Sequence, residues 1–126
     1  MLHDVLRIVT VTCLLLPVSI CAAADSVDFV GDVKPILLQH CGKCHTGKER
    51  SGGVSFDDQS SVFGVADSGA RAVVANAPNA SEILKRISAK DEELRMPPEG
   101  ERLSSQQIDA LRKWIAGGAK WPDSHA

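Results

Sequence analysis

The sequence predicts a small all-α domain, and three features of its 126 residues point to that class. Apolar residues recur at helical spacing soon after residue 25 and again near residue 110. The segments between them are rich in Gly, Pro, Ser and charge, a composition that favours loops. No segment before residue 45 alternates between apolar and polar residues as a half-buried strand would. We therefore expect helices at both ends and a long irregular middle.

Residues 1–24 are interpreted as a signal peptide. An apolar run from Ile8 to Ile20 ends in small residues that suit cleavage after Ala24. The run is too short to span a bilayer, which takes about 20 apolar residues. The alternative is a lipoprotein acylated on Cys21, which we disfavour because bulky Ile20 precedes that cysteine. Export would make residues 25–126 a single periplasmic domain in an oxidising compartment.

Charge and cysteine content narrow the function further. The net charge of −2 shows no basic excess, so a nucleic-acid partner is not expected. Of the four cysteines, cleavage would remove Cys13 and Cys21 and leave Cys41 and Cys44.

The first helix is predicted just before these two cysteines. Asp32 can cap its start, which places Pro35 in the first turn, where a missing N–H is harmless. Its apolar face would consist of four residues at helical spacing: Phe29, Val33, Ile36 and Leu37.

The middle of the chain gives weaker indications. Residues 46–61 are predicted to be loop, with room for a short extended piece at 54–56, and residues 62–80 are assigned only loosely. A short helix is expected after Ser81, because Ile83, Leu84 and Ile87 share one face. Two prolines at 97 and 98 prevent its continuation.

The last helix has the clearest boundaries. Ser104 and Gln107 form a capping box, and Leu103 and Ile108 are spaced as the hydrophobic staple around it. The apolar stripe comprises Ile108, Leu111 and Ile115, with Trp114 beside it. Gly117 and Gly118 end the helix, and the segment from Ala119 is expected to trail off.

Three short helices with two Trp, three Phe and no Tyr offer little apolar surface. The loops are also long for a compact domain, and such loops usually have a function or are held in place by a bound group. A bulky, apolar bound group would supply the missing core.

The stretch Cys41-Gly-Lys-Cys44-His45 could hold zinc, form a redox-active disulfide or anchor a haem. Structural zinc wants two separated ligand pairs, and this chain has one. Redox Cys-x-x-Cys loops follow a strand in an α/β fold, whereas this motif follows a helical pattern. The alternative without a cofactor is a chance occurrence of the pattern, or a plain disulfide, on a surface loop.

Covalent haem attachment is the interpretation we favour, because Cys-x-x-Cys-His is its sequence signature. Two thiols three residues apart can reach the two vinyl groups at one edge of a porphyrin, and His45 can then present Nε2 to the iron. Export strengthens this interpretation, since attachment occurs outside the cytoplasm in bacteria.

The sixth position of the iron decides between an electron carrier and a binder or catalyst. Met96 is predicted as the second axial ligand, because it lies in a charged loop and the two prolines after it stiffen the backbone. The alternative is that Met96 is an ordinary buried residue that fills space in the core. His125, near the chain end, is a weaker candidate.

Four polar residues near the motif have ordinary explanations. His40 is expected to bond backbone or a haem propionate, or to be exposed. Lys43, Lys48 and Arg50 could surround the haem edge and steer an acidic partner, although a solvated loop explains them better.

The same residues resemble planctomycete-type cytochrome c domains. The resemblance covers residues 28–122 and rests on the motif with the residues before it, Gly52-Gly53, Met96-Pro97-Pro98, and the ending from Leu103 to Trp121-Pro122. It implies a cytochrome c-like helical fold, haem c on Cys41 and Cys44, His45 as proximal ligand and Met96 as distal ligand. The family's domain often opens longer chains, and no activity of their further domains is carried over here.

The predicted function is an exported monohaem cytochrome c that carries single electrons between redox partner proteins of unknown identity. It would not be an enzyme, since the scattered carboxylates form no acid–base pair. The alternatives are a haem subunit of a larger dehydrogenase complex, and a haem sensor or enzyme with an open sixth site.

Overall fold

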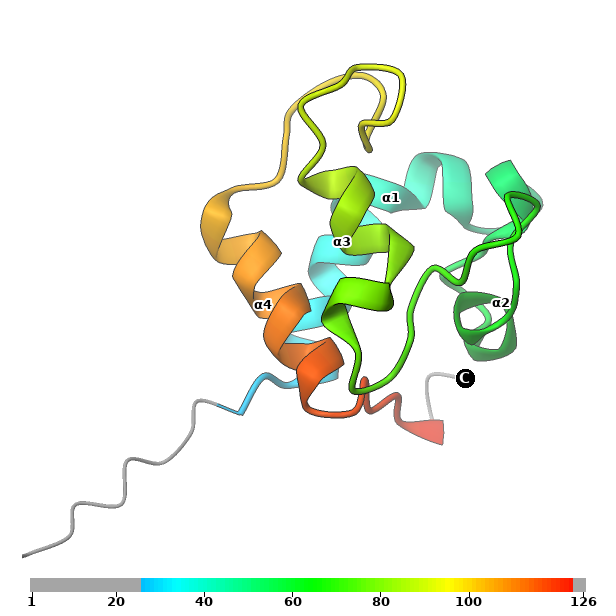
Figure 1. The fold of residues 1–126 in the computed structure, drawn as a ribbon. Coiled ribbons are helices and arrows are strands. Elements are labelled where there is room, and N and C mark those ends of the chain that lie inside the picture. The colour runs from blue at the N-terminus through cyan, green and yellow to red at the C-terminus, as the bar shows by residue number, and fades with distance from the viewer. Residues whose placement is uncertain (1–25, 124–126) are drawn as a thin grey trace, which may run out of the picture.

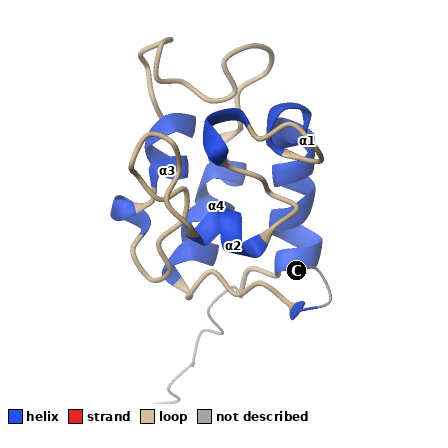
Figure 2. Ribbon diagram, turned by 90° about the vertical axis from the view of Figure 1, so that its right-hand side faces the viewer, coloured by secondary structure: helices blue, strands red, loops and turns tan. Residues whose placement is uncertain are grey.

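The computed structural model describes residues 26–123 and confirms the all-α prediction for that range. Figure 2 shows helices and loops without a strand in this part of the chain. The α-helices are α1 (Lys34–His45), α2 (Gln59–Phe63), α3 (Glu82–Ile87) and α4 (Ser105–Ala116), with shorter helical turns η1 (Phe29–Val33), η2 (Ser51–Gly53) and η3 (Pro78–Ala80). The predicted signal peptide, Cys21 and His125 lie outside the described residues.

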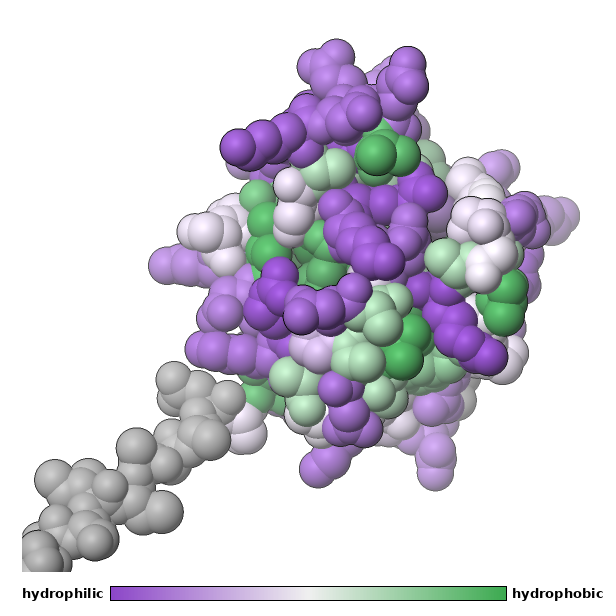
Figure 3. Space-filling view, viewed as in Figure 1, coloured by the Kyte–Doolittle hydropathy of each residue, from purple (hydrophilic) through white to green (hydrophobic). Residues whose placement is uncertain are grey.

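The helices form a small bundle around η1 and α1. α3 lies beside α4, and η1 contacts α4, while α2 lies apart on the other side of the molecule (Figure 1). The loop from α3 to α4 projects above the bundle in this view. Figure 3 shows mostly hydrophilic side chains over that projecting loop, so it is a solvated feature. None of the helices within residues 26–123 is long and apolar enough to cross a membrane.

The first helix starts earlier than predicted, and Asp32 is not its cap. A π-helical turn precedes α1, and the Asp28 carboxylate caps that turn by accepting the Gly31 N–H at 2.7 Å. The Asp32 carboxylate instead accepts the Asp28 N–H at 2.8 Å, so both carboxylates stabilise this first turn. Pro35 does lie in the first turn of α1.

The middle of the chain contains a helix that the sequence did not reveal. α2 begins at Gln59 and is capped by Asp58, whose carboxylate accepts the Ser60 N–H at 3.0 Å. The predicted extended piece at 54–56 forms no strand, although the Val54 backbone is extended with φ −109° and ψ 132°. An isolated antiparallel bridge between Val65 and Arg71 follows α2.

The predictions for α3 and α4 are confirmed in most details. Ile83, Leu84 and Ile87 are buried on one face of α3. The capping box at the start of α4 is present, because Ser104 Oγ accepts the Gln107 N–H and Gln107 Oε1 accepts the Ser104 N–H. α4 ends at Ala116 with Gly117 as its C-cap, and Gly118 follows with φ 101°, a conformation that favours glycine.

The segment after α4 does not trail off, contrary to the prediction. Trp121 is buried and packs against Phe29 with ring centroids 4.3 Å apart and ring planes tilted by 40°. The Trp114 indole N–H donates to the Lys120 carbonyl at 2.9 Å, which fixes the chain against the end of α4. Phe29, Trp114 and Trp121 therefore gather at the junction of η1 and α4, where they close one end of the core.

Candidate functional site

A cavity of about 270 Å³ separates α1 from α3. α1 and residues between 51 and 72 that lie on either side of α2 form its walls, and α3 and residues 96–98 complete it. Its lining is mainly apolar, as binding sites for apolar small molecules are, and its volume is close to the lower end of their usual range of about 300–1,000 Å³. The predicted site residues Cys41, Cys44, His45 and Met96 all line this one cavity.

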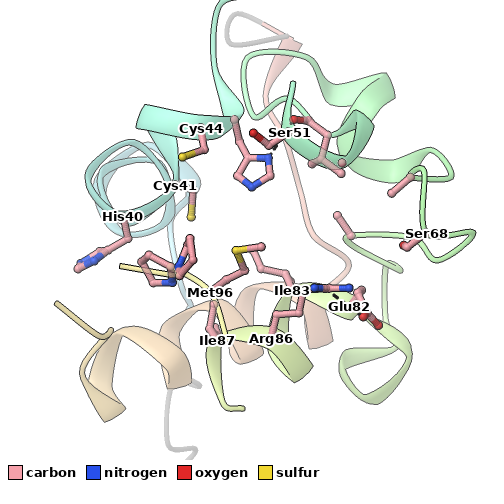
Figure 4. Close-up of a pocket in the computed structure, with 17 residues that line it drawn as sticks. His40, Cys41, Cys44, Ser51, Ser68, Glu82, Ile83, Arg86, Ile87 and Met96 are labelled. Atoms are coloured by element: carbon pink, nitrogen blue, oxygen red, sulfur yellow. Dashed lines mark hydrogen bonds and ion pairs between the residues drawn. The ribbon is translucent and has the colours of Figure 1, made fainter. Parts of the chain in front are cut away.

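Cys41 and Cys44 lie on the last turns of α1, which continues through the whole motif to His45. Their spacing of three residues puts both side chains on one helix face. Both thiols are free, and Figure 4 shows both sulfur atoms on the cavity side of α1.

His45 ends α1, and its ring is held by the loop on the opposite wall. Its Nδ1 lies 3.1 Å from the Val54 carbonyl, which can only accept, so Nδ1 carries the proton. The Phe56 ring meets the imidazole edge-on with centroids 5.6 Å apart, and the Phe56 N–H donates to the His45 carbonyl at 2.7 Å. The tautomer that results leaves a lone pair on Nε2, the arrangement found in metal-ligating histidines.

The loop that supplies the Val54 carbonyl is itself anchored by α2. The Ser61 hydroxyl accepts the Ser55 N–H at 2.9 Å and donates to the Gly53 carbonyl at 3.3 Å. The helix that the sequence did not reveal thus fixes the backbone group that orients His45.

Met96 comes from the loop between α3 and α4. Its N–H donates to the Arg86 carbonyl at 3.1 Å, and its side chain is partly buried against the core. Figure 4 shows the Met96 sulfur directed toward the middle of the cavity. Two thiols, an imidazole and a thioether therefore converge from two separate parts of the chain.

Comparison with known proteins bears on this arrangement. The planctomycete cytochrome C family model matches residues 41–100. This is the family that the sequence resembles. No curated protein and no solved structure matches the chain.

The match begins at Cys41 and ends at Gly100, so it contains all four converging residues. The resemblance seen in the sequence reaches further, over residues 28–122, and its two ends lie outside the match. A cytochrome c domain implies a haem, which agrees with the apolar lining and the sulfur and nitrogen donors of the cavity.

The structure around the motif does not favour the redox-disulfide and zinc interpretations. Burial, with a smaller contribution from Cys44, raises the pKa of the Cys41 thiol to about 11, whereas redox-active thiols have lowered pKa values. The motif also lies at a helix C-terminus, not at the N-terminus that stabilises a thiolate. Within residues 26–123, no three His, Cys, Asp or Glu side chains are grouped as a metal ion would require.

His40 lines the cavity, but its partner differs from those predicted. Its Nε2 lies 3.1 Å from Gln107 Nε2, so it bonds a side chain of α4. Lys43, Lys48 and Arg50 are exposed and do not line the cavity, and Arg50 lies 3.8 Å from Asp58.

Four polar residues that line the cavity were not identified from the sequence: Ser51, Ser68, Glu82 and Arg86. Glu82 and Arg86 are four residues apart on α3, and the Arg86 Nε donates to Glu82 Oε1 at 3.2 Å. Their i, i+4 spacing was visible, but nothing in the sequence placed α3 beside the motif.

Proposed function

We propose that the chain is an exported monohaem c-type cytochrome that carries single electrons. The observation that supports this most directly is the convergence of Cys41, Cys44, His45 and Met96 on one mainly apolar cavity within the family domain. A bound haem would supply an iron centre that changes its charge by one electron.

The residues present fit such a group. Cys41 and Cys44 would hold it through thioethers, each formed when a thiol S–H adds across a vinyl group. His45 would ligate through Nε2, since its Nδ1 is engaged by Val54. Met96 would ligate through sulfur, and the apolar lining would exclude water, so that the pair of ligands sets a reduction potential above that of bis-histidine ligation.

The proposal includes a location and a class of partner. The chain would act outside the cytoplasm after removal of residues 1–24, or at the membrane if Cys21 is lipidated. Its partners would be redox proteins, and it would not itself be an enzyme.

A haem-content experiment tests the proposal. The chain should be exported from a host that attaches haem c, and analysed by pyridine haemochrome spectrum and intact mass. We expect one haem c per chain and a mass increase of one haem over the processed polypeptide. A folded, exported protein without covalent haem would contradict the proposal.

Met96→Ala separates an electron carrier from a sensor or enzyme with an open sixth site. In a carrier, the variant should lose the sulfur–ferric iron charge-transfer band and its reduction potential should fall. An unchanged spectrum would show that Met96 is not the ligand, whereas co-purification of the wild-type protein with a dehydrogenase would indicate a complex subunit.

A further inference from the structure

The two ends of the cavity differ in chemistry. Cys41 and Cys44 lie at one end, and Glu82, Arg86 and Ser68 lie at the other, with Met96 between them (Figure 4). Apolar side chains such as Ile83 and Ile87 of α3 lie along the cavity with Met96. A ligand that fills it therefore needs an apolar body and a polar end directed away from the cysteines.

The charged residues of α3 form a cluster at this end of the cavity. Glu82 accepts from Arg86 Nε at 3.2 Å and lies 3.6 Å from Lys85 Nζ, so one carboxylate is shared by two cations. Glu82 and Arg86, which line the cavity, carry opposite charges, and Lys85 adds a positive charge outside the lining.

The Arg86 guanidinium has unused donors. Its side chain is only 29% exposed. Among residues 26–123, Glu82 is its only side-chain partner, and that bond uses Nε alone. The terminal nitrogens of a half-buried guanidinium suit a carboxylate, which they can bind in a bidentate manner.

We infer that Arg86 is the main residue of a carboxylate subsite for the haem propionates, with Ser68 as a hydroxyl donor at its rim. This inference rests on the proposed function. Haem carries its vinyl groups and its two propionates on different parts of the ring, so a haem tethered at Cys41 and Cys44 has its carboxylates available to the other end. Glu82 then orients the guanidinium by holding Nε.

Arg86 also connects this subsite to the proposed ligand. Its main-chain carbonyl accepts the Met96 N–H, while its side chain faces the charged end. A side-chain substitution leaves that main-chain bond in place, so the effects on the propionates and on Met96 can be separated.

The test compares haem-loaded Arg86→Gln, Arg86→Lys and Lys85→Gln. Lys85 is the matched control, because it is the neighbouring cation on α3, is 59% exposed and does not line the cavity. In Arg86→Gln, loss of a positive charge beside the ring should favour ferric iron about tenfold, a fall of ~59 mV for one electron. Arg86→Lys should recover most of this shift, and Lys85→Gln should produce a small fraction of it because solvent and salt screen its charge.

The second readout is the set of propionate bending bands in the resonance Raman spectrum. These should move in Arg86→Gln and not in Lys85→Gln, while the sulfur–iron charge-transfer band persists in both. Should Arg86→Gln fold poorly, Glu82→Gln supplies the opposite test, since loss of a negative charge should raise the potential.

The outcomes distinguish the two proposals. Wild-type protein without covalent haem would overturn the proposed function. Haem-loaded Arg86→Gln with unchanged propionate bands, or with a potential shift equal to that of Lys85→Gln, would overturn the carboxylate subsite alone. A Glu82→Gln variant with an unchanged or lowered potential would do the same.

Discussion

The two proposed iron ligands come from regions that are held in different ways. His45 ends a twelve-residue helix, and its ring bonds Val54 and contacts Phe56. Met96 lies in an irregular, mostly exposed loop, and its main chain is attached to the body of the domain through Arg86. The comparison indicates that the motif side acts as a fixed wall, whereas the methionine side is the part that local opening would release first.

Removal of both Cys41 and Cys44 thiols, the proposed attachment points of the haem, should have the largest effect on the stability of the domain. In the double variant Cys41→Ala/Cys44→Ala, no haem can be attached, and the cavity between α1 and α3 loses the group proposed to fill it. We expect a poorly folded product with reduced helical circular dichroism and no cooperative melting transition. A double variant that melts like the wild-type protein would show that the fixed wall needs no haem.

Phe56→Ala should damage the fixed wall directly. Phe56 is buried against the His45 ring, and truncation of a buried phenylalanine costs about 3–5 kcal/mol. Denaturant unfolding of the haem-loaded protein measures this loss. The control is Leu94→Ala on the methionine loop, where the side chain is 52% exposed and the expected change is within about 0.5 kcal/mol. Equal losses for the two variants would remove the distinction between the regions.

Ser104→Ala tests the point where the methionine loop ends. The Ser104 hydroxyl caps α4, and loss of such a cap costs about 1 kcal/mol. Thermal unfolding should show a lowered Tm with an unchanged charge-transfer band, because Ser104 does not line the cavity. Ser104→Asp, which preserves the cap, should unfold close to the wild-type temperature.

Arg102→Gln should give the smallest loss of stability. It is also the most direct test of whether the methionine loop opens separately from the motif side. Arg102 Nη1 donates to the Ala89 carbonyl at 3.1 Å and so closes the base of the methionine loop at the surface. We expect a loss of less than about 1 kcal/mol, as for a typical single hydrogen bond. The charge-transfer band should nevertheless disappear at a lower temperature than in the wild-type protein. If band and global fold are lost together in both proteins, the loop does not open separately.

The sequence predicted the fixed wall better than the charged end of the cavity. Helical spacing and the capping box located α1, α3 and α4, because these signals are local in the chain. Arg86 was not identified, because its proposed role depends on α3 packing beside the motif at residues 41–45. Trp121 was misjudged for a similar reason, since its burial depends on Phe29 at the other end of the domain.

The side-chain amide of Gln107 connects the start of α4 to a residue of α1 that is distant in sequence. Its oxygen accepts the Ser104 N–H and so completes the cap of α4. Its nitrogen bonds His40, which directly precedes Cys41 and lies 67 positions away in sequence. Since an amide nitrogen can only donate, His40 must accept through Nε2 and keep its proton on Nδ1. Helix initiation near the C-terminus and the seating of the cysteine-bearing helix are thereby coupled through a single side chain.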